Sequence, residues 1–107
     1  MLKLIVLLKR KRGITHEQFR EHWETVHGPL VRRLTPGILR YVQNHPEEPA
    51  DGIDGVAELW FADREGFEEC RRFGTSLAAE PIHDDEDLFL DRSAMRFMVV
   101  DEREISI

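Results

Sequence analysis

The chain has 107 residues, of which 41% are apolar, a formal net charge of −6 and a single cysteine. This length fits one domain with a modest core, and the acidic balance argues against nucleic-acid binding, which needs clustered basic side chains. Cys70 alone forms neither an intrachain disulfide nor a cysteine-based zinc site, so we expect a cytoplasmic protein without a signal peptide or membrane span.

The first predicted strand covers residues 2–9, which are rich in Ile, Val and Leu. Its charged end, residues 9–12, is more typical of a solvated turn than of an anion site. A helix is then predicted to begin after Thr15, a good N-cap. Gln18 stands three residues later, at the capping-box position.

This helix is predicted to run to about His27. The following Gly28-Pro29 pair stops or kinks it, because the residue before a proline avoids the α region. Pro29 can also begin a further turn through Leu34. The second strand covers residues 39–45, and residues 46–54, with two prolines and four acidic residues, are predicted to form an exposed loop.

The third strand is predicted over residues 56–61. Asp63 is expected to cap a second helix that ends near Phe73. A weaker helical stretch follows over residues 76–87, interrupted near Pro81.

A fourth strand over residues 93–101 completes the order βαββαβ. This order is the α+β, ferredoxin-like arrangement, in which an antiparallel four-stranded sheet carries both helices on one face. A sheet with one face in water shows clean alternation of apolar and polar residues, but both faces of the first and fourth strands are apolar here. In the first strand, one face carries Leu4, Val6 and Leu8, and the other carries Ile5 and Leu7. In the fourth strand, one face carries Met95, Phe97 and Val99, and the other carries Ala94, Met98 and Val100. We therefore expect a homodimer that stacks two sheets into a barrel and encloses a cavity in each half.

Two histidines border the apolar stripe of the first predicted helix. His27 is either a helix C-terminal residue that caps carbonyls or an acid or base at the edge of a cavity. His22 fits a partly exposed packing residue better. Trp23 lies within the stripe, where a core role is the alternative to contact with a substrate.

The second strand carries more polar side chains than core packing requires. Tyr41, Gln43 and His45 share one face by the period of two, with Asn44 on the other. Facing a dimer cavity, the three would offer a phenol, an amide and an imidazole to a ligand. On a plain sheet the same row would face solvent, and His45, next to a proline, can also be a loop residue.

Charged residues inside apolar strands are costly to bury unless they are paired or functional. Glu58, which alternates with Trp60, is therefore either an ion-pair or rim residue or a cavity carboxylate of raised pKa. Arg96 raises the same question. The large aromatic residues are expected mainly in the core: Trp23, Trp60, Phe61, Phe67 and Phe97.

The sequence offers no good candidate for a metal site or a nucleophilic cysteine. The His-Glu-x-x-His pattern of zinc helices does not occur. Cys70 lies within the second predicted helix and fits a buried, inert thiol. The acidic run from His83 to Asp87 is expected to be a solvated turn, since nothing fixes a coordination geometry. We therefore expect no metal and no organic cofactor.

The sequence resembles the EthD-like family of the dimeric α/β-barrel superfamily. The resemblance rests on Lys9-Arg10-Lys11, Gly13-Ile14-Thr15, Glu17, Phe19, Trp23, His27-Gly28-Pro29, Tyr41, Gln43-Asn44-His45 and the run from Asp54 to Phe61. It implies a ferredoxin-like protomer that forms a barrel dimer, in a superfamily that includes cofactor-free monooxygenases, polyketide cyclases, decarboxylases and lactone isomerases. The family is named for a gene product associated with fuel-ether breakdown by a cytochrome P450 system.

We expect a cavity protein that acts on a small hydrophobic molecule, aromatic or polyketide-like, without binding nucleic acid or membrane. His27 or His45 would transfer a proton in a decarboxylation, dehydration, cyclisation or isomerisation. The candidate substrate-binding residues are Tyr41, Gln43, Asn44, Glu58, Trp60 and Trp23. One alternative is an oxygenase, or an accessory to one, in the degradation of ethers or aromatics, and another is a non-catalytic ligand-binding module.

Overall fold

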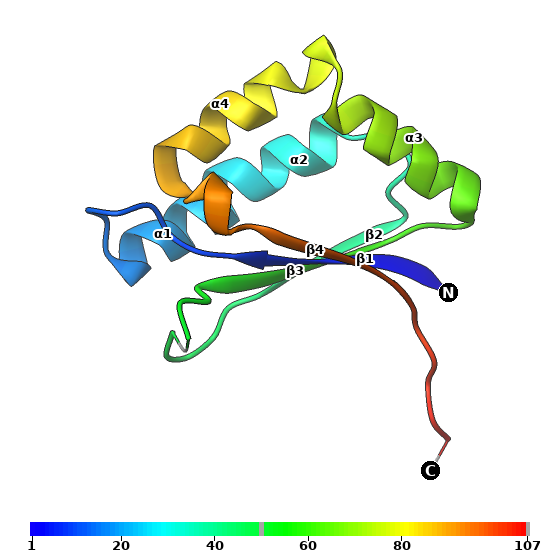
Figure 1. The fold of residues 1–107 in the computed structure, drawn as a ribbon, viewed down its shortest axis with the longest axis horizontal. Helices are drawn as coiled ribbons and strands as arrows, with labels where there is room; N and C mark the ends of the chain where they lie inside the picture. Colours follow the sequence, from blue (N-terminus) through cyan, green and yellow to red (C-terminus); the bar gives the residue numbers. More distant parts are fainter. Residues whose placement is uncertain (50, 107) are drawn as a thin grey trace.

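A four-stranded antiparallel sheet forms one layer of the protein, and the helices cover one of its faces (Figure 1). The computed structural model describes residues 1–49 and 51–106. This is the α+β, ferredoxin-like architecture that the sequence predicts. The elements in chain order are β1 (Leu2–Leu8), α1 (His16–His22), a π-helical segment (Trp23–His27), α2 (Gly28–Leu34), β2 (Arg40–Asn44), β3 (Gly55–Trp60), α3 (Arg64–Gly74), a 3₁₀ turn (Leu77–Ala79), α4 (Glu80–Phe89), a 3₁₀ turn (Arg92–Ala94) and β4 (Arg96–Asp101).

The strand order β2-β3-β1-β4 places β1 in the middle of the sheet and β4 at one edge. Val6 pairs with Ala57 of β3 on one side and with Phe97 of β4 on the other. Tyr41 of β2 pairs with Leu59. Because opposed residues point to the same face, this register puts Tyr41 on the face that holds the buried Val6 and Leu59.

The first helix begins as predicted. Thr15 Oγ1 accepts a hydrogen bond from the Gln18 backbone N–H at 3.1 Å, and Gln18 Oε1 accepts from the Thr15 N–H at 2.8 Å, so the capping box is complete. The chain does not leave the helix at Gly28-Pro29. It passes through one π-helical turn, in which the Gly28 N–H bonds the Trp23 carbonyl, and continues as α2 to Leu34.

The second helical region departs from the sequence-based prediction after α3, whose Asp63 cap is confirmed. Pro81 does not interrupt a helix; it sits in the first turn of α4, where a missing N–H costs nothing. The acidic run from His83 to Asp87 is therefore helical and not a turn. β4 begins at Arg96, three residues later than predicted, because a 3₁₀ turn precedes it.

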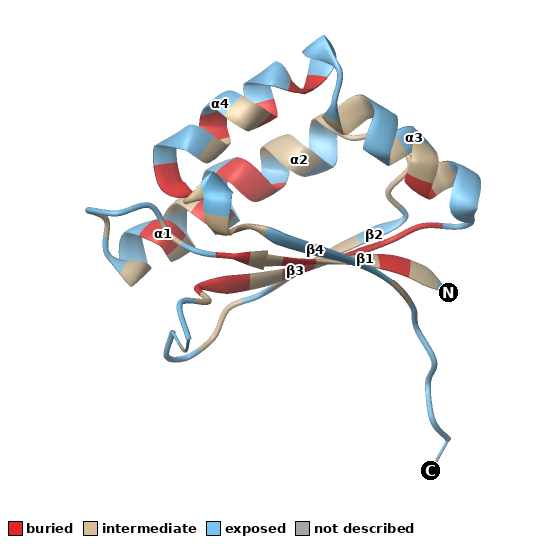
Figure 2. Ribbon diagram, viewed as in Figure 1, coloured by how far each residue is buried: buried red, intermediate tan, exposed pale blue. Residues whose placement is uncertain are grey.

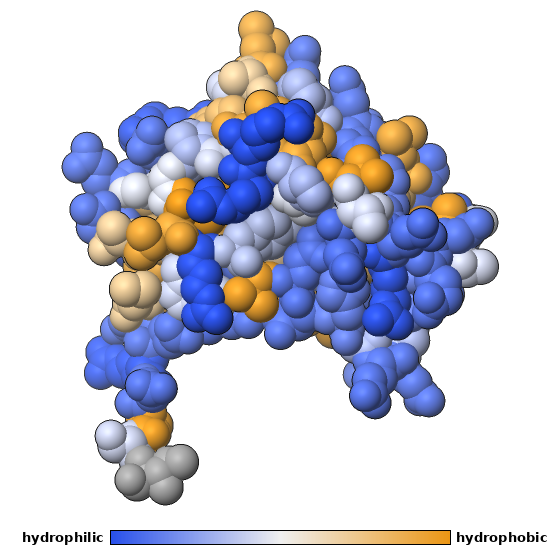
Figure 3. All heavy atoms as spheres, turned by 180° about the vertical axis from the view of Figure 1, so that it is seen from behind, coloured by the Kyte–Doolittle hydropathy of each residue, from blue (hydrophilic) through white to orange (hydrophobic). Residues whose placement is uncertain are grey.

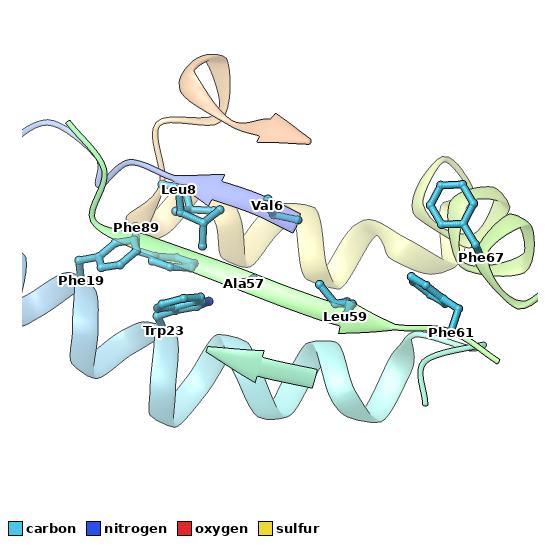
Figure 4. Close-up of a cluster of buried hydrophobic side chains, with 10 residues drawn as sticks. Val6, Leu8, Phe19, Trp23, Ala57, Leu59, Phe61, Phe67 and Phe89 are labelled. Atoms are coloured by element: carbon cyan, nitrogen blue, oxygen red, sulfur yellow. The ribbon is translucent and has the colours of Figure 1, made fainter. Parts of the chain in front are cut away.

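The core lies between the sheet and the helices (Figure 2). Phe19, Trp23 and Phe89 pack together near the amino-terminal half of the first helix, and Phe61 meets Phe67 at the other end (Figure 4). The expected core role holds for Trp23, Phe61 and Phe67. Trp60 is also buried, but on the opposite face of the sheet, where it packs against Lys3 and Arg40. Phe97 is the exception: it lies on the edge strand with 63% of its surface exposed.

The opposite face of the sheet carries both apolar and charged side chains. The side of the molecule seen from behind also mixes hydrophobic and hydrophilic residues (Figure 3). Lys3 and Glu58 form an ion pair on it, while Met98 of β4 is 53% exposed. No helix in the described ranges is long and apolar enough to cross a membrane.

Candidate functional site

A cavity of about 600 Å³ lies inside the protomer, between the sheet and the helices. Its wall is mostly apolar and includes Leu4, Val6, Leu8, Ala57 and Leu59 from the sheet. The polar residues in the wall include His27, Tyr41, His83, Glu86 and Arg92. The sequence predicts a cavity against the open face of the sheet, covered by a second subunit, whereas this pocket lies on the other face, between the sheet and the protomer's own helices.

His27 reaches this cavity from the π-helical turn. It is 4% exposed, and its Nδ1 lies 2.8 Å from Asp85 Oδ2 of α4. A carboxylate only accepts hydrogen bonds, so the ring proton sits on Nδ1 and the Nε2 lone pair is left free. Burial lowers the pKa of His27 and so favours the neutral imidazole. The nearby Asp85 has the opposite, smaller effect. The His27 side chain therefore bonds a carboxylate of α4 and does not cap the carbonyls at the end of its own helix.

Asp85 is the central residue that sequence reasoning missed. It is 8% exposed, and it also contacts His22 Nε2 through both carboxylate oxygens, at 2.9 and 3.0 Å. Both histidine rings pack against Phe89, with centroids 4.6 and 4.9 Å away. The sequence does contain a signal for the burial of Asp85, because Ile82, Asp85 and Phe89 follow the spacing of one buried helix face.

Gln43 holds the π-helical turn in place. Its Nε2 donates to the Trp23 carbonyl at 2.9 Å, and a Cβ on Gly28 would stand 2.5 Å from the same Nε2. A larger residue at position 28 would therefore force the Gln43 amide to move away from the Trp23 carbonyl. π-helical turns often occur at functional sites, and this one carries His27 at its end.

Tyr41 lies in the cavity wall, as a substrate-binding role requires. Gln43 Nε2 donates to its hydroxyl oxygen at 3.3 Å, which leaves the Tyr41 proton available to a ligand. Burial raises the pKa of Tyr41, so the phenol stays protonated.

His45 does not join His27 in the cavity wall. Its ring packs on Trp23 at a centroid distance of 4.7 Å, and its Nε2 donates to Gln43 Oε1 at 2.9 Å. Burial lowers the pKa of His45 as well. Trp23 itself lines the cavity and is 1% exposed, so it serves both the core and the wall.

The remaining three candidates lie on the opposite face of the sheet. Glu58 accepts from Lys3 Nζ at 2.6 Å and from Asn44 Nδ2 at 2.9 Å. These contacts hold the pKa of Glu58 below its usual range, so the ion-pair alternative applies and the raised-pKa alternative is wrong. Trp60 Nε1 donates to Glu102 Oε1 at 2.7 Å in the same network. Arg96 is also exposed.

Glu86 is the second residue that sequence reasoning missed. It lines the cavity one position after Asp85, and its Oε2 lies 4.0 Å from His27 Nε2. Its Oε1 lies 3.5 Å from Arg92 Nε. Burial raises the pKa of Glu86 despite this arginine. The cavity thus holds an imidazole, His27, whose pKa is lowered, and a carboxyl, Glu86, whose pKa is raised.

Cys70 also lines the cavity, and burial raises the pKa of its thiol. A raised pKa keeps the sulfur protonated and poorly nucleophilic. This agrees with the inert thiol expected from the sequence.

The family model described as the EthD domain matches residues 11–93. A comparison with curated protein sequences finds no match. Among solved structures, an ethyl tert-butyl ether d (ethd) family protein from Bacillus halodurans shares 20% identity over 96% of this chain and 99% of its own, with a TM-score of 0.72.

Two similar structures have a stated activity. The hydroxynitrile lyase from Passiflora edulis has 15% identity, covers 97% of this chain and 96% of its own, and gives a TM-score of 0.64. SnoaB, a cofactor-independent oxygenase from Streptomyces nogalater, has 12% identity, covers 97% and 94%, and gives 0.66. Others are described as dimeric ferredoxin-like proteins of unknown function. At such identities the likeness concerns the fold.

Proposed function

This chain belongs to the EthD domain family, and we propose that it binds a small hydrophobic carbonyl or hydroxyl compound and catalyses proton transfer on it without a cofactor. His27 is the general base. The observation that carries the proposal is the position of His27: a buried imidazole in the wall of an apolar cavity, with Nδ1 held by Asp85 and Nε2 free.

The arrangement supports this chemistry step by step. Nε2 takes a proton from a carbon beside a carbonyl, and Asp85 stabilises the imidazolium that forms. Tyr41 orients the carbonyl oxygen through its free O–H. A positioned base of this kind contributes on the order of 10² to 10⁴ in rate. The same step can begin a decarboxylation, dehydration, cyclisation or isomerisation.

The proposal includes a homodimer formed through the open face of the sheet. That face presents apolar side chains of β1 and β4, including Ile5, Leu7 and Met98, beside the ion pair of Lys3 and Glu58. Stacking two sheets would cover these residues. Since the cavity lies on the other side of the sheet, the dimer would support the site without forming its walls.

A second candidate is cofactor-independent oxidation of an electron-rich phenol, favoured by the similarity to an oxygenase structure. His27 would then deprotonate the phenol in the same cavity. Oxygen consumption with a phenol separates this candidate from proton transfer alone. A ligand carrier would bind the compound and do neither.

The test uses 2-tetralone, an apolar bicyclic ketone, in D₂O. Wild-type protein is expected to accelerate deuterium incorporation beside the carbonyl, followed by NMR. His27→Gln should lose this activity, and His45→Gln should keep it, because of these two histidines His27 alone lines the cavity. No acceleration by the wild type, or full activity of His27→Gln, would remove the proposal.

A further inference from the structure

We infer that Glu86 is the acid partner of His27: it delivers a proton to the substrate oxygen while His27 removes one from the neighbouring carbon. The inference rests on the proposed function and narrows its substrate class to apolar ketones with a hydrogen on the carbon beside the carbonyl.

The geometry of the two groups suits adjacent substrate atoms. His27 comes from the π-helical turn and Glu86 from α4, and both line the same cavity. Their facing atoms, Nε2 and Oε2, are 4.0 Å apart. In a ketone, the carbonyl oxygen and the neighbouring carbon lie about 2.4 Å apart by standard bond lengths. One group can therefore reach the carbon while the other reaches the oxygen.

The surroundings of Glu86 favour a carboxyl that carries a proton. Its side chain is 13% exposed, and its Oε1 lies 3.5 Å from Arg92 Nε. His83 and Arg92 favour the charged form, whereas burial and the neighbouring carboxylates Asp85 and Asp87 oppose it. Burial is the largest of these influences, and Oε2 is left to face His27.

The proposed step balances without an oxidant or a metal. The C–H bond breaks as its proton passes to His27 Nε2, and its electron pair becomes the new carbon–carbon double bond. The carbonyl π pair moves to oxygen, which takes the proton from Glu86 Oε2. The products are an enol, an imidazolium and a carboxylate, and the reverse step at either carbon restores a ketone.

Tyr41 is a weaker choice for this acid. Burial raises the pKa of its phenol, so it releases its proton reluctantly, whereas a carboxyl of raised pKa is a stronger acid than a phenol. Tyr41 can donate a hydrogen bond to the oxygen without giving up its proton. The two residues would then share the carbonyl, one orienting it and the other protonating it.

The test compares Glu86→Gln with Asp84→Asn, which removes one negative charge from an exposed position of the same helix. Gln keeps the shape and can donate a hydrogen bond, but it cannot transfer a proton. Glu86→Gln should slow deuterium exchange of 2-tetralone by about 10²-fold. It should still bind 2-naphthol, an aromatic analogue of the enol, with a Kd close to that of the wild type. Asp84→Asn should change neither measurement.

The pH profile gives a readout that a structural role would not move. Wild-type exchange should fall at high pH as Glu86 loses its proton, and Glu86→Gln should lack this limb. Wild-type rates in Glu86→Gln, or a loss of exchange matched by an equal loss of 2-naphthol binding, would overturn the inference while leaving His27 as the base. If the wild type exchanges nothing, the proposed function falls and this inference falls with it.

Discussion

The His27 imidazole and the Asp85 carboxylate are joined by a buried hydrogen bond of 2.8 Å between Nδ1 and Oδ2. This bond connects the π-helical turn of the first helix to α4, through two residues that are 58 positions apart in the sequence. It fixes which ring nitrogen of His27 carries the proton, and so it determines that the other nitrogen faces the cavity as a base.

Replacing Asp85 with Asn should reverse the His27 tautomer. An amide can donate to Nδ1, which would move the ring proton to Nε2 and remove the base from the cavity. Exchange of 2-tetralone should fall by about 10² to 10⁴-fold. Nitrogen-15 NMR of the histidine side chains checks the tautomer directly. An unchanged His27 spectrum in Asp85→Asn would show that Asp85 does not set it.

Replacing Gly28 with Ala should destabilise the protein by about 1 to 3 kcal/mol, the usual range for forced overpacking. The new Cβ would stand 2.5 Å from Gln43 Nε2 and 3.0 Å from the Trp23 carbonyl oxygen. Urea unfolding measures the effect. Gly74→Ala, also in a helix, is the matched control, because its Cβ meets nothing within 4 Å; an equal loss in both variants would contradict the close packing described here.

The stability of the protein should fall as the pH drops below about 6.5. Burial depresses the folded-state pKa of His27 below its ordinary value of 6.5, so the unfolded chain binds more protons in that range. The contribution of His27 is therefore fully present above pH 6.5 and is lost as the pH falls through its folded-state pKa. Glu86 acts in the opposite sense: its pKa is raised above 4.5, so its contribution is present at low pH and lost as the pH rises through the raised value.

Urea unfolding between pH 5 and 7.5 tests this sign. The slope of unfolding free energy against pH should be flatter in His27→Gln than in the wild type, because the variant lacks the depressed group. An identical slope in both proteins would show that His27 does not carry the effect. His45, whose pKa burial also lowers, should leave a smaller residual slope in the variant.

Introducing a charge on the open face of the sheet should abolish dimerisation. Met98 is 53% exposed in the protomer, so Met98→Glu should leave the fold intact while placing a carboxylate in the proposed interface. Sedimentation velocity should give a dimer for the wild type and a monomer for the variant. Val26→Glu, at a helical position that is 47% exposed, should remain dimeric. A monomeric wild type would refute the interface.

Bound ligand should protect Cys70 from alkylation. Cys70 is the only cysteine of the chain and lines the cavity, and burial raises the pKa of its thiol, so N-ethylmaleimide should react slowly. Saturating 2-naphthol should slow the reaction further, as measured by intact mass. Labelling that is equally fast with and without 2-naphthol would place the ligand elsewhere.

The fold was largely predictable because its signals are local. The Thr15 capping box, the Asp63 cap and the Ile, Val and Leu-rich strands each depend on neighbouring residues. The sequence alone does not decide whether the helix continues through Pro29, because a proline can follow the end of one helix or stand in the first turn of another. The same ambiguity explains why Pro81 begins α4 and does not interrupt a helix as the sequence predicts.

The site was less predictable because it depends on contacts between distant elements. The period of two places Tyr41, Gln43 and His45 on one face of β2, but it does not say which face the helices cover. That depends on pairing with β3, where Tyr41 meets Leu59. Asp85 was missed because a run of acidic residues usually faces water, whereas here two histidines from the first helix bury it.

A crystal structure of the protein with 2-naphthol bound would test most directly the claim that His27 is the base of a ligand cavity. We predict that the naphthol rings fill the cavity and that the hydroxyl oxygen lies within hydrogen-bond distance of His27 Nε2, about 2.6 to 3.2 Å. Naphthol bound outside the cavity, or bound inside it with the hydroxyl directed away from His27, would contradict the claim.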